Sequence, residues 1–92
     1  MNRIDALKIL EEEGLKYYNW FGEHKVRANE VIIDRKDAQW GVCVSDERAC
    51  IVETSYSFFD TEEDAIDRFI KLVRFEKRYH YLDRKYYLLL QN

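Results

Sequence analysis

The chain has 92 residues, of which 47% are hydrophobic and 15% aromatic, and its formal net charge is −3. This length predicts a single domain, residues 1–92, and the aromatic side chains let so short a chain bury a useful core. The acidic balance argues against general nucleic-acid binding. We also find no secretory signal and no apolar run near the roughly 20 residues that span a bilayer, so we expect a cytoplasmic protein without a membrane segment.

The N-terminal part of the chain predicts a helix followed by strands. Apolar residues recur at helical spacing over residues 3–13, with Asn2 as the expected N-cap and Gly14 as the expected stop. Residues 17–21 are β-prone, and residues 31–33 form the centre of a second predicted strand.

Residues 39–45 and 49–56 carry the clearest hairpin pattern in the sequence. Every second residue from Trp40 to Val44 is apolar, which is typical of a strand with one buried face. The turn of this hairpin is predicted at Asp46 and Glu47. The opposite face of the hairpin is less polar than a solvated face should be, which suggests that the C-terminal segment partly covers it.

The hairpin would place Cys43 opposite Cys50. Two reduced thiols that pack as small apolar groups are the favoured interpretation, with a redox pair or half of a metal site as the alternative. His24 and His80 have no partners at metal-site or catalytic-triad spacing. The sequence therefore predicts no catalytic residues, no metal site and no cofactor.

A second helix is predicted to begin at Asp60, with Asp60 and Glu63 forming a capping box. It continues to about Tyr79, and residues 80–91 fit either a helix or an extended tail. Its apolar stripe consists of Ile66, Phe69, Ile70 and Val73. The order of elements predicts an α+β fold. It has an N-terminal helix, a three- to four-stranded antiparallel meander, a long C-terminal helix packed on the sheet, and an extra C-terminal helix or tail.

Charge is distributed unevenly along the chain. Residues 43–64 contain seven acidic residues and one Arg, a net of −6, whereas residues 71–86 contain six basic and two acidic residues, a net of +4. An acidic patch attracts a basic partner, although ordinary solvated surface explains the same pattern. The basic segment also contains aromatic residues, which suits either single-stranded nucleic acid or simple packing: Phe75, Tyr79, Tyr81, Tyr86 and Tyr87.

Four segments together resemble a family of small bacterial immunity proteins of polymorphic toxin systems, immunity-protein family fifty-nine. They are Tyr18–Gly22, Trp40–Arg48, Phe58–Ala65 and Phe69–Arg74. The shared features are a tryptophan-led strand, an Asp-Glu-Arg turn and a Phe-Asp-x-Glu-x-x-Ala start to a helix. The resemblance covers residues 4–74 and leaves out the basic, aromatic C-terminal segment.

The resemblance implies a non-enzymatic protein that binds a cognate toxin effector domain, a nuclease in many such systems, and neutralises it by tight one-to-one occlusion. One departure is Ala49, where the family has Gly after the turn. The expected charged contacts are Asp46, Glu47, Asp60, Glu62, Glu63 and Asp64. The expected aromatic anchors are Trp20, Phe21, Tyr56 and Phe58.

Two other functions fit the sequence. One is a nucleic-acid-binding regulator that uses the basic aromatic C-terminal segment, and the other is a small adaptor or structural homodimer. The acidic net charge disfavours the first. We expect the free protein to be a monomer or a weak homodimer.

Overall fold

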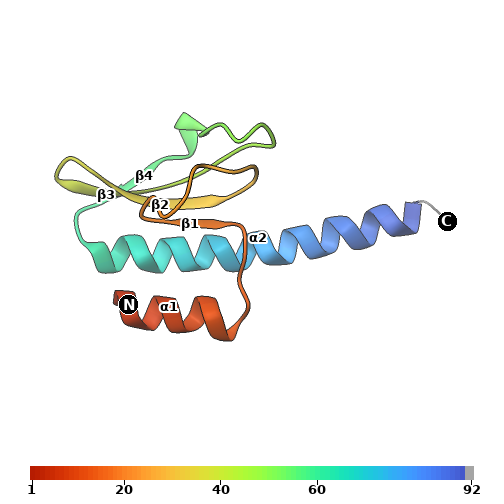
Figure 1. Cartoon of the computed structure of the whole chain (residues 1–92), viewed down its shortest axis with the longest axis horizontal. Helices are drawn as coiled ribbons and strands as arrows, with labels where there is room; N and C mark the ends of the chain where they lie inside the picture. Colours follow the sequence, from red (N-terminus) through yellow and green to blue (C-terminus); the bar gives the residue numbers. More distant parts are fainter. Residues whose placement is uncertain (91–92) are drawn as a thin grey trace.

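The computed structural model describes the backbone of residues 1–90 and the side chains of residues 1–77 (Figure 1). Its elements are the helix α1 (Arg3–Glu12), the strands β1 (Tyr18–Trp20), β2 (Val31–Lys36) and β3 (Gln39–Val44), the short 3-10 helix η1 (Glu53–Ser55), the strand β4 (Ser57–Phe59) and the helix α2 (Glu62–Leu90). The predicted α+β fold, with a helix before the sheet and a long helix packed on it, is confirmed.

The sheet is mixed, with the strand order β1-β2-β3-β4. β2, β3 and β4 form the predicted antiparallel meander, but β1 runs parallel to β2. The cause is the connection after β1. Phe21 and Gly22 have positive φ angles of 49° and 71°, and they turn the chain out of the sheet. The chain then needs residues 23–30 to return to the end where β1 began, which only a parallel pairing allows.

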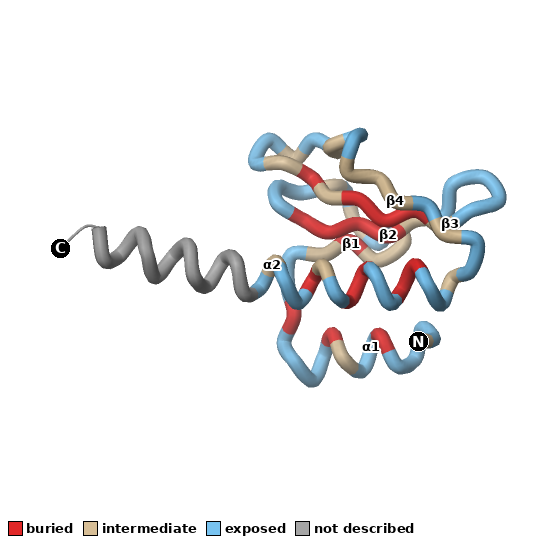
Figure 2. The backbone as a smooth tube through the Cα atoms, turned by 180° about the vertical axis from the view of Figure 1, so that it is seen from behind, coloured by how far each residue is buried: buried red, intermediate tan, exposed pale blue. Residues whose placement is uncertain are grey.

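α2 lies between the sheet and α1 (Figure 1). The face of the sheet toward α2 carries Val31, Ile33 and Val42, which are almost fully buried. α1 packs on the other side of α2 through Ala6 and Leu10. The predicted stripe of α2 is confirmed as its buried face, shown in red in Figure 2: Ala65, Ile66, Phe69, Ile70 and Val73. This apolar burial is the main source of stability for the fold.

The helix ends follow the predictions with one exception. Asn2 caps α1 by accepting a hydrogen bond from the Asp5 N–H at 2.8 Å, and Gly14 ends it with a φ of +59°. The predicted capping residue of α2 is wrong by one position. The Thr61 hydroxyl accepts from the Asp64 N–H at 3.3 Å, whereas the Asp60 carboxylate accepts from the Gln39 side chain across the sheet. The acidic residue three positions after the capping residue is therefore Asp64 and not Glu63.

The predicted hairpin between residues 39–45 and 49–56 is wrong. β3 pairs with β2 and β4, and residues 49–56 contribute one isolated bridge and η1. The side chain of Asp46 is the reason, because its Oδ1 accepts from the N–H groups of Arg48 and Cys50 and closes a compact loop. Ala49 in this loop has a φ of +62°, a conformation that favours glycine.

The corrected strand pairing also separates the two cysteines. Cys43 is buried opposite Ile32 of β2, Cys50 is exposed in the loop after β3, and both are free thiols. The predicted cross-strand placement of the pair is therefore wrong, and only Cys43 packs as a small apolar group. Burial raises the pKa of the Cys43 thiol, which keeps it protonated at neutral pH.

Two exposed ion pairs connect α1 to α2. The Arg3 guanidinium binds the Glu62 carboxylate with contacts of 2.6 and 3.2 Å near the start of both helices. Near their other ends Arg74 binds Glu13 with contacts of 3.0 and 2.5 Å, and Lys77 Nζ donates to the Glu13 carbonyl. Such exposed pairs contribute little energy. Their positions show that the two helices lie side by side and run in the same direction.

Most of the predictions for the C-terminal segment concern residues after 77, whose side chains the structure does not describe. The backbone of α2 continues as one helix to Leu90. The side chains of the predicted aromatic segment at Tyr79, Tyr81, Tyr86 and Tyr87, and that of His80, lie beyond the described residues. None of the helical residues that are described forms a stretch long and apolar enough to cross a membrane.

Candidate protein-binding surface

The structure places the predicted acidic contacts at opposite ends of β3. Asp46 and Glu47 follow its last residue, whereas Asp60 binds Gln39 at its first residue. Six residues of a strand span about 17 Å, so the two groups do not form one surface. The residues at the start of α2 lie with Asp60: Glu62, Glu63 and Asp64.

The acidic residues also differ in what they already contact. Asp46 closes the loop after β3, and Glu62 binds Arg3. Three exposed carboxylates remain together around the start of α2, and we call them the acidic rim: Asp60, Glu63 and Asp64. Glu47 is exposed at the other end of β3.

Two of the four predicted aromatic anchors are half-buried and used within the fold. Trp20 packs on Phe69 of α2 with ring centroids 5.6 Å apart, and the Arg3 guanidinium lies 4.2 Å over the ring of Phe21. Tyr56 and Phe58 form a stacked pair instead, with centroids 5.3 Å apart and an angle of 3° between the planes. Phe58 is 49% exposed, so this stacked pair, the aromatic platform, faces solvent.

The platform is built on the face of the sheet that the helices leave open. Gly41 lies beneath Tyr56, and a Cβ there would approach the Tyr56 ring and Asp34 Oδ1 to 3.0 Å. The Tyr56 hydroxyl donates to Asp34 Oδ2 at 3.0 Å. Burial, assisted by Cys43 and Asp34, raises the pKa of Tyr56, so the hydroxyl remains a donor. The predicted cover on this face therefore comes from the segment before β4 and not from the C-terminal segment.

Asp60 continues the same face of the sheet. β3 and β4 pair so that Phe58 lies opposite Gly41, and the next outward-facing pair along this register is Gln39 and Asp60. The Gln39 amide donates to Asp60 Oδ1 at 3.1 Å across these positions. Phe58 and Asp60 are therefore neighbours two residues apart, and the platform adjoins the acidic rim.

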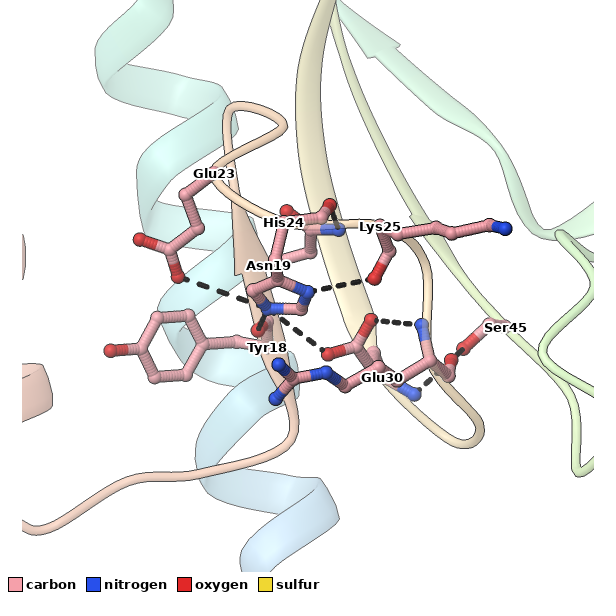
Figure 3. Close-up of polar contacts among 8 residues, drawn as sticks. Tyr18, Asn19, Glu23, His24, Lys25, Glu30 and Ser45 are labelled. Atoms are coloured by element: carbon pink, nitrogen blue, oxygen red, sulfur yellow. Dashed lines mark hydrogen bonds and ion pairs between the residues drawn. The ribbon is translucent and has the colours of Figure 1, made fainter.

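A second polar cluster lies at the far edge of the sheet, around His24 (Figure 3). The Asn19 amide donates to the His24 carbonyl at 2.8 Å, while buried Glu30 accepts from the Arg27 N–H at 2.7 Å. The Ser45 hydroxyl accepts from the Glu30 N–H, also at 2.8 Å, and donates to the Arg27 carbonyl. This network fixes the connection between β1 and β2.

Both ring nitrogens of His24 face acceptors (Figure 3). Nδ1 is 2.8 Å from the Lys25 carbonyl oxygen and Nε2 is 3.1 Å from the Tyr18 carbonyl oxygen. Because a carbonyl only accepts, both contacts are hydrogen bonds only when both nitrogens carry a proton, and the Glu30 carboxylate 3.4 Å from Nε2 favours this charged form. These contacts, the Lys25 carbonyl first among them, raise the pKa of His24.

A groove of about 650 Å³ lies beside this cluster, and its walls include Lys16, Tyr18, His24 and Arg27. Since both His24 nitrogens are engaged by the backbone, the ring has a structural role in this arrangement and no lone pair for proton transfer. The side chain of His24, for which the sequence predicts no metal or catalytic role, is 22% exposed. The sequence did not predict that the carboxylate of Glu30 is buried, because its only distinguishing feature there is its position before an apolar strand.

Within residues 1–77, whose side chains are described, no group of three or more His, Cys, Asp or Glu is placed to hold a metal ion. Compared with models of known families, curated proteins and solved structures, the chain gives no match. The resemblance to the immunity proteins therefore stays a hypothesis that depends on the segments quoted from the sequence.

Proposed function

We propose that this protein binds another protein through the open face of its sheet, and that it serves in the cytoplasm as the immunity protein of a toxin effector domain. The exposed aromatic platform carries the proposal. Phe58 presents an uncovered ring, held by a stacked tyrosine, on the same face of the sheet as the exposed carboxylate of Asp60. Exposed aromatic residues with a charged rim are the usual centre of a protein interface.

The charge of the rim supports a basic partner. Asp60, Glu63 and Asp64 lie at one end of the sheet, and Lys36 is the basic residue that contacts the platform. A cluster of this sign speeds association with a basic protein surface and repels acidic ones. Occlusion of a basic toxin cleft requires such a surface and no chemistry from the inhibitor.

The test is co-expression with the product of the neighbouring gene, followed by measurement of growth rescue and of the association rate of the purified pair. In the variant Glu63→Lys with Asp64→Lys we expect association at low salt to slow about tenfold. The control is Glu47→Lys, an exposed acid at the other end of β3, which matches each single substitution, Glu63→Lys or Asp64→Lys, in its change of charge. No rescue and no complex with the wild-type protein would refute the function, and equal slowing by the control would refute the surface.

A further inference from the structure

We infer that the platform and Asp60 together bind an arginine side chain of the protein partner. The role of this contact in toxin neutralisation rests on the proposed function, but recognition of the guanidinium group depends only on the described residues. Phe58 supplies a flat apolar ring for stacking and Asp60 supplies a carboxylate on the same face of the sheet.

The platform is rigid before any partner arrives. Tyr56 covers one side of Phe58, and Tyr56 is itself held by Asp34 and by the close approach of Gly41. A ring that is already fixed loses little conformational entropy when a ligand stacks on it. The sheet therefore presents Phe58 in one orientation, with half of its surface open to solvent.

The fold already places a cation on this aromatic pair. Lys36 Nζ lies 4.4 Å from the centroid of the Tyr56 ring, within the range of a cation–π contact. The register of β2 and β3 puts Lys36 opposite Gln39, on the same face of the sheet as Tyr56 and Phe58. The aromatic rings of this face therefore accept a cation within the fold, and the ring of Phe58 is the one left open to solvent.

Asp60 makes arginine the best match among cations. Its Oδ1 accepts from Gln39, and no described residue donates to its Oδ2. A planar guanidinium can stack on a ring and direct N–H groups at a neighbouring carboxylate simultaneously, whereas the compact ammonium of lysine is less suited to both contacts. The remaining rim residues, Glu63 and Asp64, strengthen the negative potential around the same position.

The experiment uses the full chain and N-acetyl-arginine amide as the probe. The backbone amides of residues 57–61 and the ring protons of Phe58 are followed by NMR at low salt as the probe is added. We expect saturable shifts with arginine, binding roughly threefold weaker with N-acetyl-lysine amide, and no saturable shift with the uncharged citrulline analogue. Non-saturable shifts with arginine, or equal shifts with citrulline, would overturn the inference.

Three variants locate the binding. Phe58→Leu keeps an apolar side chain and removes the π face, so we expect roughly threefold to fivefold weaker binding, and Asp60→Asn should weaken it by up to about fivefold. The matched control is Phe75→Leu, which removes another exposed aromatic ring on α2 among basic residues. If binding is unchanged in both Phe58→Leu and Asp60→Asn, or falls equally in the control, the site is wrong.

The outcomes separate this inference from the proposed function. Saturable arginine binding that Phe58→Leu weakens supports the inference even where the neighbouring gene product forms no complex. A tight complex that rescues growth, with no arginine-specific shifts at the platform, supports the proposed function and refutes the inference.

Discussion

The two faces of the sheet are built by different means. On the face under α2, Ile33, Val42 and Phe69 are almost completely buried and pack without polar contacts between their side chains. On the open face, a half-buried hydrogen bond from Tyr56 to Asp34 supports the stacked ring of Phe58, which is exposed. The covered face therefore supplies the stability of the fold, while the open face can vary its chemistry without unfolding the protein.

Two phenylalanines test this division most strongly. Phe69→Ala removes a fully buried ring between β1 and α2, and we expect it to lower the free energy of unfolding by about 3–5 kcal/mol. Phe58→Ala removes a ring of the same size from the open face and should lower it by about 1 kcal/mol or less. Urea unfolding followed by circular dichroism measures both values.

The m-value, which is the dependence of the free energy of unfolding on urea concentration, is the internal control. Equal m-values show that the two variants unfold from comparable native states, so that the midpoints report stability alone. A loss above about 3 kcal/mol for Phe58→Ala would show that the open face is part of the core, and the division between the faces would then fail.

Gly41 sharpens the comparison because it lies on β3 directly beneath the Tyr56 ring of the open face. In Gly41→Ala the new methyl group meets the Tyr56 ring and Asp34 Oδ1 at 3.0 Å, so one of them must move. We expect a loss of about 1–3 kcal/mol in the free energy of unfolding from this overpacking. Thermal unfolding with a heat-capacity correction gives the value.

The same substitution in a Tyr56→Ala background isolates the cause. Removing the ring leaves room for the methyl group, so the additional loss from Gly41→Ala should fall well below its value in the wild-type background. If the loss is the same in both backgrounds, the ring is not what excludes a side chain at this position.

Sequence patterns predicted the covered face and not the open one, for a physical reason. The stripe of α2 and the cap at Asn2 depend on residues a few positions apart, and both are confirmed. The open face depends on Tyr56 reaching Asp34, 22 residues away, and on the Asp46 side chain that closes the loop after β3. Alternating apolar residues cannot reveal contacts of that kind, so the hairpin was assigned to the wrong partner.

The sequence predicted only part of the candidate site, because it indicates residue types but not which distant residues the fold brings together. Phe58, Tyr56 and Asp60 were among the predicted contacts, and the structure places them together on one face. Trp20 was predicted by residue type alone, but its position on β1 directs it at Phe69. Residue type indicates which side chains suit an interface, whereas strand register decides which of them reach solvent.

Substitution of His24, at the edge of the sheet, has the smallest expected effect on the free energy of unfolding, and this effect depends on pH. The folded state raises the pKa of His24 above its ordinary value near 6.5, so the protonated ring stabilises the fold. This contribution is complete below the unfolded pKa and is lost as pH rises through the folded pKa. The groups that face the ring are Glu23, Glu30 and Arg27, together with the carbonyl oxygens.

His24→Gln removes the titrating group and keeps one amide donor, so at pH 6 we expect a loss of about 1–2 kcal/mol in the free energy of unfolding. Because the wild-type protein loses its advantage as His24 deprotonates, the difference between the two proteins should shrink from pH 6 to pH 9. Urea unfolding at several pH values measures it, and NMR titration of the ring protons gives the folded pKa directly. If the difference in the free energy of unfolding between the two proteins stays constant across this range, His24 acts by packing alone. The edge of the sheet at β1 would then be stabilised by packing, as the covered face is, and not by a charged ring.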